Sequence, residues 1–113
     1  MSVQPGTYNI TLQRRADYSL LLQFKDSSDA VINLTGYTAY AQVWNEGRTT
    51  KYADFSIAYT NRANGQITIS LTDAQTATFI DELRYDVLLE DANGSREYYL
   101  EGVIFVSQGY TAP

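Results

Sequence analysis

Hydrophobic and polar residues alternate along most of this chain, and the alternation predicts short β-strands. Successive side chains of an extended strand point to opposite faces, so an alternating apolar set marks a buried face. The clearest case is residues 66–71, where Ile67, Ile69 and Leu71 alternate with polar residues. Comparable patterns predict further strands at residues 7–13, 18–25, 30–34, 38–44 and 54–60.

The strongest hairpin signal is Asn93-Gly94, which lies between two apolar runs near the C-terminus. A two-residue type I′ turn needs positive φ at both central residues, and this pair tolerates it. The turn would join strands within residues 84–107. The residues predicted to share one apolar face of this hairpin are Tyr85, Val87, Leu89, Tyr98, Leu100, Ile104 and Val106. Such a face must be covered, so we expect the other strands to pack on it.

One short helix interrupts the predicted strands. Thr72 and Gln75 have the spacing of a capping box, which predicts one or two helical turns reaching Phe79 or Ile80. The remaining chain gives about eight strands with turn signals roughly every 8–12 residues and no βαβ pattern, which is typical of an antiparallel sandwich. A small closed barrel is the competing architecture.

The length of 113 residues predicts a single β-sandwich domain over residues 1–113, with an N-terminal arm at 1–6 and a C-terminal tail at 108–113. Such a chain buries roughly 65% of its unfolded surface, which is enough for one core without disulfides. The net charge of −5 argues against a nucleic-acid partner. No apolar run approaches the ~20 residues of a membrane span, and no signal peptide is recognisable.

The side chains needed for catalysis or metal binding are few. The chain has no cysteine and no histidine, which removes thiolate ligands, the usual general base near neutral pH and the commonest metal ligand. The carboxylates are scattered, and we interpret them as solvated surface. Asp91 to Gly94 resembles the start of a calcium loop, but the glycine is fourth and not sixth, so a plain turn is expected. We therefore predict no catalytic residues, no cofactor and no metal.

One set of apolar residues has no place in a one-sided core. If the small residues of 38–44 face inward, Tyr40, Gln42 and Trp44 face outward. The assigned parities add Leu88, Tyr99, Val103 and Phe105 to this outward set. Part of the set would be a second covered layer or a flank of the helical turn, or the set would be a patch that another protein covers. The predicted protein-interface residues are Tyr40, Trp44, Tyr99, Val103 and Phe105. Aromatic side chains on a β face also stack on sugar rings, so a carbohydrate-binding site that includes Gln42 is an alternative.

Three segments together resemble a known family of proteins. They begin at Asn33-Leu34-Thr35-Gly36, at Gly65-Gln66-Ile67-Thr68 and at Tyr85-Asp86-Val87-Leu88, the last leading to Leu100-Glu101-Gly102. In that order and spacing they resemble small immunoglobulin-like β-sandwich virion proteins of tailed bacteriophages, including phages of cyanobacteria. The resemblance covers roughly residues 7–107. Within it, Gly102 is a strand glycine that predicts a bulge or the close approach of a neighbouring backbone or ring.

The resemblance implies a non-enzymatic structural or adaptor protein of the virion, made in the host cytoplasm. Its partners would be other virion structural proteins of the tail, baseplate, fibre or neck. The chain would form a homo-oligomer in the assembled particle and would bind neither nucleic acid nor membrane. Two alternatives stay open: a carbohydrate-binding module for host surface glycans and a capsid decoration protein. Tyr40 and Trp44 stand where this family would be expected to carry long polar residues.

Overall fold

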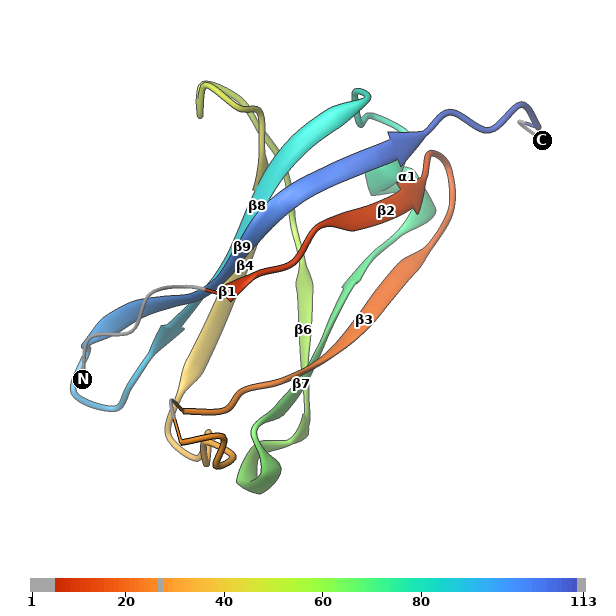
Figure 1. The fold of residues 1–113 in the computed structure, drawn as a ribbon. Coiled ribbons are helices and arrows are strands. Elements are labelled where there is room, and N and C mark those ends of the chain that lie inside the picture. The colour runs from red at the N-terminus through yellow and green to blue at the C-terminus, as the bar shows by residue number, and fades with distance from the viewer. Residues whose placement is uncertain (1–5, 27, 112–113) are drawn as a thin grey trace.

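The computed structural model describes residues 6–26 and 28–111 as two β-sheets that enclose one apolar core (Figure 1). The larger sheet has the order β1-β9-β8-β4-β5, with β2 also paired to β9, and the smaller has the order β3-β7-β6. The larger sheet contains β1 (Gly6–Thr7), β2 (Ile10–Gln13), β4 (Thr38–Trp44), β5 (Lys51–Asp54), β8 (Glu82–Glu90) and β9 (Arg96–Ser107). The remaining elements are β3 (Tyr18–Gln23), β6 (Ser56–Asn61), the 3₁₀ turn η1 (Arg62–Asn64), β7 (Gln66–Leu71) and the helix α1 (Asp73–Thr76).

The strand order is that of an immunoglobulin-like sandwich. Strands β4, β8 and β9 lie in one sheet and β3, β7 and β6 in the other, as the C, F, G and B, E, D strands do in that fold. The pairings are antiparallel except that β1 and β2 run parallel to β9. The prediction of an all-β immunoglobulin-like sandwich is therefore confirmed, and the closed barrel is ruled out. The parallel pairs correct the expectation of a purely antiparallel fold.

The alternating residues meet between the sheets. Along β7, Ile67, Ile69 and Leu71 are buried, and along β4 the small residues Ala39 and Ala41 are buried, as their periodicity predicts. The side chains with at most 1% of their surface exposed come from both sheets and include Ile10, Val43, Ile67, Ile69, Leu83, Val87, Leu89 and Ile104. Burial of this continuous apolar layer is the main stabilising contribution to the fold.

Several predicted elements have other bounds in the structure. Residues 30–34 form no strand. Val31 makes an isolated β-bridge with Lys25, and this bridge is not extended into a ladder. The segment 7–13 is divided into β1 and β2, and Gly6 belongs to β1 and not to an arm. Residues 51–53, which lie outside the predicted strands, form β5 together with Asp54. The rest of the predicted arm, residues 1–5, and the end of the tail, residues 112–113, lie outside the described residues.

The short helix begins as predicted and ends early. Thr72 and Gln75 form a capping box, with the Thr72 hydroxyl accepting from the Gln75 amide and the Gln75 side chain accepting from the Thr72 amide. The helix ends at Thr76, before the predicted Phe79. The Thr76 hydroxyl is fully buried and donates to the carbonyl of Ala16, which fixes the helix to the start of β3.

The hairpin between β8 and β9 has a longer loop than predicted. Glu90 pairs with Arg96, so five residues connect the strands, and of Asn93 and Gly94 only Gly94 has a positive φ, of 86°. The Asp91 carboxylate accepts from the backbone amides of Asn93 and Ser95 and so stabilises this turn. The prediction of a type I′ turn is wrong, because a side chain acting as a local acceptor favours the wider loop.

A β-bulge at Tyr99 then corrects the register. Tyr98 pairs with Leu88, but Leu100 pairs with Val87, so Tyr99 is the extra residue. The bulge reverses the predicted orientation of two side chains. Tyr98, expected inside, is 51% exposed. Tyr99, expected outside, packs against the core and meets Phe24 edge-to-face at 5.8 Å.

Candidate functional site

The outward side of β4, β8 and β9 carries the side chains that the core does not use. We call this surface the open face. Cross-strand pairing arranges it in rows that follow directly from the register. Its residues are Tyr40, Gln42, Trp44, Arg84, Asp86, Leu88, Tyr98, Glu101, Val103 and Phe105.

The first row is apolar and largely exposed. Tyr40 lies opposite Leu88, and Leu88 lies opposite Tyr98. The exposed fractions are 45% for Tyr40 and 51% for Tyr98. Phe105, farther along β9, is 43% exposed. Large aromatic side chains left half exposed on one face are typical of surfaces that bind a partner.

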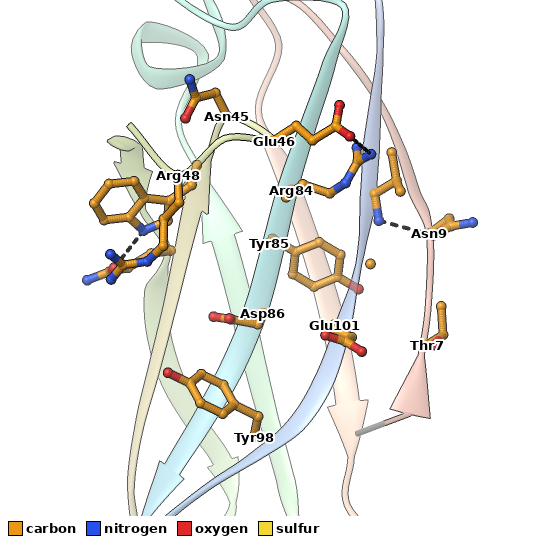
Figure 2. A pocket seen from close by; sticks show the side chains of 14 residues that line it. Thr7, Asn9, Asn45, Glu46, Arg48, Arg84, Tyr85, Asp86, Tyr98 and Glu101 are labelled. Atoms are coloured by element: carbon orange, nitrogen blue, oxygen red, sulfur yellow. Dashed lines mark hydrogen bonds and ion pairs between the residues drawn. The ribbon is translucent and has the colours of Figure 1, made fainter. Parts of the chain in front are cut away.

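The next two rows, Gln42–Asp86–Glu101 and Trp44–Arg84–Val103, are more polar and line a hollow with a volume of about 500 Å³. Figure 2 shows Asp86 on β8 and Glu101 on β9, with Tyr98 at one end of the hollow and Arg84 with Glu46 at the other. The loop after β4 forms part of the wall through Arg48, and the segment between β1 and β2 forms another part through Asn9. Three separate regions of the chain therefore build this hollow.

Trp44 is held in place by two polar neighbours. Its indole Nε1 donates to the Gln42 amide oxygen at 2.9 Å. The guanidinium carbon of Arg48 lies 4.6 Å from the centre of the indole ring, which is a cation–π contact. Trp44 is half-buried as a result, and one face of its ring is already occupied. It forms a wall of the hollow and does not project from it.

Two carboxylates lie next to each other at the centre of the open face. Asp86 and Glu101 are cross-strand partners, and neither forms an ion pair among the residues that the structure describes. Burial and the charge of Glu101 raise the pKa of Asp86, and the positive charge of Arg48 opposes part of this shift. The hollow thus offers carboxylate acceptors that a cationic or hydroxyl-rich partner would satisfy.

The wall formed by β1 and β2 depends on a close backbone approach. The ring of Tyr85 passes beneath Gly102, and its hydroxyl donates to the carbonyl of Tyr8. A Cβ atom at position 102 would lie 2.0 Å from that carbonyl oxygen, so the predicted close approach at Gly102 is confirmed. The chain leaves β9 locally here, and the Asn9 side-chain oxygen accepts from the Val103 amide at 3.0 Å instead. Burial also raises the pKa of the Tyr85 hydroxyl.

The structure places the five predicted interface residues in three different environments. Tyr40 and Phe105 are exposed on the open face, where the parity argument put them. Trp44 and Val103 point the same way but are half-buried in the hollow. Tyr99 packs against the core, so it is withdrawn as a contact residue.

Four residues of this surface are not predicted from the sequence. The alternation predicts Tyr98 in the core, because no local signal marks the bulge at Tyr99. Asp86 is among the carboxylates interpreted as solvated surface, and nothing in the sequence marks Arg48 as a site residue, although both line the hollow. Asn9 could not be found because its contact with Val103 joins residues 94 positions apart.

The described part of the chain contains no group of three or more Asp, Glu, His or Cys residues placed to hold a metal ion. The Asp91 carboxylate is engaged by its own turn, and Asp26 likewise accepts from the amides of Ser28 and Ala30. Neither helical segment of residues 6–26 and 28–111 is long and apolar enough to cross a membrane.

Comparison with known proteins finds similarity among solved structures. No protein-family model matches the chain, and no curated protein is similar to it. Among solved structures the chain is similar to the crystal structure of the Lin-41 filamin domain, with 14% sequence identity and a TM-score of 0.48. The match covers 88% of this chain and 84% of that one. Values this low carry no functional argument, and the assignment of the fold rests on the strand order.

Proposed function

We propose that this chain is a non-enzymatic structural or adaptor domain of a tailed-phage virion, and that it docks to other virion proteins through its open face. The observation that carries the proposal is the exposed row formed by Tyr40, Leu88 and Tyr98. The resemblance of the sequence to virion proteins of this fold supplies the biological setting.

Leaving this apolar row in water has a free-energy cost that docking would remove. Burying an aromatic side chain contributes about 1.5–3 kcal/mol, and two half-exposed tyrosines retain about half of that each. Tyrosine is also among the residues most often found as a contact hot spot. The exposed row is therefore sufficient for the centre of a docking surface, with the polar hollow as its rim.

The charge distribution suggests the character of the partner surface. The Asp86–Glu101 pair adjoins the aromatic row and has no cation of its own within ion-pair distance in the described part of the chain. A partner that places an arginine or lysine there would pair both carboxylates while its apolar surface covers the tyrosines.

The test uses particles of the phage whose genome encodes the chain. Mass spectrometry of purified particles should find the chain in stoichiometric amount. Particles assembled with a Tyr40→Ala/Tyr98→Ala variant should contain much less of it, while the isolated variant keeps its melting temperature within a few degrees. Tyr110→Ala is the matched control, because Tyr110 is 98% exposed and lies outside the open face. Absence of the chain from particles, or normal incorporation of the double variant, would refute the proposal.

A second candidate is favoured by the hollow itself. Aromatic rings, amides and carboxylates together are the groups that bind sugars, and Trp44, Tyr98, Gln42 and Asp86 all line this hollow. The second proposal is therefore a carbohydrate-binding module for host surface glycans. A glycan array should give a hit that Gln42→Ala weakens and Tyr110→Ala does not. No hit across the array would count against this candidate.

A further inference from the structure

The outer edge of β3 is the least protected strand edge of the sandwich. In the constant-type immunoglobulin fold the first strand pairs with this position, but here both β1 and β2 pair with β9. No strand pairs with the outer edge of β3 among the residues that the structure describes. The flank beside it stays open, with a hollow of about 310 Å³ between β3 and β9.

The backbone groups on this edge are identified by the pairing with β7. The amide of Phe24 donates to Gly65, in the same register that pairs Leu22 with Ile67 and Leu20 with Ile69. Alternate residues of an antiparallel strand bond to the same side, so the even-numbered residues face β7. The N–H and C=O groups of Ser19, Leu21 and Gln23 therefore point to the open side.

The other sheet edges carry features that discourage pairing with another chain. β5 has a register shift and a Lys51–Asp54 ion pair, and β6 has a register shift after Ala58. The edge formed by β1 and β2 is interrupted at Tyr8 and Asn9. In contrast, β3 has six uncharged residues in regular register, with Leu21 55% exposed at its middle.

We propose that the outer edge of β3 pairs antiparallel with the same edge of a second copy, about a twofold axis at Leu21. In this register Leu21 lies opposite Leu21 of the second copy, and Ser19 lies opposite Gln23. All backbone groups on the open edge then find partners, and the two smaller sheets become one continuous sheet.

Charge complementarity favours a second copy over an unrelated strand. The residues that flank β3 are Asp17 and Lys25, and both are exposed. Since each lies four positions from Leu21, the twofold register places Asp17 of one copy opposite Lys25 of the other, twice. A shift by two residues in either direction breaks both ion pairs and places Leu21 opposite a polar residue. The outer edge of β3 is therefore complementary to the same edge of a second copy, and it is so in a single register.

This inference adds to the proposed function the surface by which copies associate, and it does not depend on the open face. Sedimentation equilibrium of the purified chain, in a series reaching about 1 mM, should show a monomer–dimer equilibrium. Leu21→Lys, which places two lysines opposite each other, should leave a monomer. Tyr98→Lys is the matched control, because it also introduces a lysine in place of a large side chain at a similarly exposed site, here on the open face, and it should dimerise as the wild type does.

A pair of charge variants tests the register. Lys25→Glu and Asp17→Lys each place like charges opposite one another in a homodimer, so each should dimerise about tenfold more weakly. Mixed together they should form a heterodimer of wild-type affinity, because both ion pairs are then restored. Asp17 also accepts from the Asp73 amide, so the melting temperature of Asp17→Lys is measured first, and Lys25→Glu alone suffices if it does not fold. A monomeric wild type, a dimer lost in Tyr98→Lys but kept in Leu21→Lys, or no preference for the heterodimer would overturn the inference.

Discussion

Among the glycines with negative φ, Gly102 is the one whose replacement by alanine should destabilise the fold most. The added Cβ would lie 2.0 Å from the Tyr8 oxygen, 2.8 Å from the Tyr8 carbonyl carbon and 3.1 Å from the Tyr85 ring. Real Cβ atoms essentially never approach backbone closer than 3.0 Å, so the strand segment at Tyr8 has to move by about 1 Å. The neighbours here are backbone and a buried ring, which cannot turn aside.

The magnitude follows from what this movement disturbs. Overpacking in a well-packed region costs about 1–3 kcal/mol. The Tyr85 hydroxyl would also lose its acceptor at Tyr8, and a buried unpaired polar group costs about 1–3 kcal/mol. Since relaxation at one site partly relieves the other, we expect a loss of about 3 kcal/mol in the free energy of unfolding. A domain of this size has about 6–17 kcal/mol, so the variant should still fold.

Urea unfolding followed by the fluorescence of Trp44, the single tryptophan, measures this loss. The midpoint should fall while the slope with denaturant stays the same. Gly47→Ala is the control, because its Cβ would have no neighbour nearer than 3.9 Å, and it should change stability by less than about 0.5 kcal/mol. Tyr85→Phe combined with Gly102→Ala should be less than additive, since both act on the Tyr8 carbonyl. A Gly102→Ala variant as stable as Gly47→Ala would show that this approach is not close.

Three further predictions test the bulge, the carboxylates and the helix cap. Tyr99→Ala should lower the free energy of unfolding by about 2 kcal/mol, and Tyr98→Ala should lower it by less than about 0.5 kcal/mol. Urea titrations measure both losses, and equal losses would contradict the bulge. Burial and Glu101 raise the pKa of Asp86 in the folded state, so the ionisation of this one group destabilises the fold as the pH rises above 3.8, the ordinary value. Asp86→Asn should thus be more stable at pH 7, by less than about 1 kcal/mol, and the gain should vanish near pH 3; melting curves at both pH values check this. Thr72→Ala removes the acceptor for the Gln75 amide and should cost about 1 kcal/mol by thermal denaturation, with no loss indicating that the cap is dispensable.

The elements that could be predicted from the sequence are those specified by local chemistry. Ile67, Ile69 and Leu71 alternate without interruption, and the capping box at Thr72 needs only residues within one turn of helix. Both came out as expected because no distant contact competes with them. The sandwich class followed in the same way, from strands that each bury one face.

The elements that could not be predicted depend on contacts between distant residues. Residues 51–54 have no apolar alternation of strand length in the sequence, and they become a strand by pairing with the edge of β4. The division between β1 and β2 results from the ring of Tyr85 beneath Gly102. Gly102 predicts a close approach, but no local pattern shows that the segment at Tyr8 makes it. The hollow of the open face is missed for the same reason, since its walls come from three separate regions of the chain.

The hairpin shows how two local departures can cancel. The wider loop held by Asp91 shifts the pairing by one residue, so that Glu97 lies opposite Leu89. The bulge at Tyr99 shifts it back, and Leu100 onward pairs as a two-residue turn would have required. The inward parity of Ile104 and Val106 was therefore correct although the turn was wrong.

This compensation has a consequence for the surface. Between the loop and the bulge the pairing of β8 with β9 is shifted by one residue. This shift is confined to the tip of the hairpin, where Tyr98 points outward beside Leu88 and Tyr40. Without the bulge Tyr98 would be buried and the apolar row would be broken at β9. An exposed aromatic row adds little to the stability of the isolated fold, whereas a bulge disrupts the strand ladder. A loop and a bulge that together expose this row therefore make sense if the row is covered by another molecule.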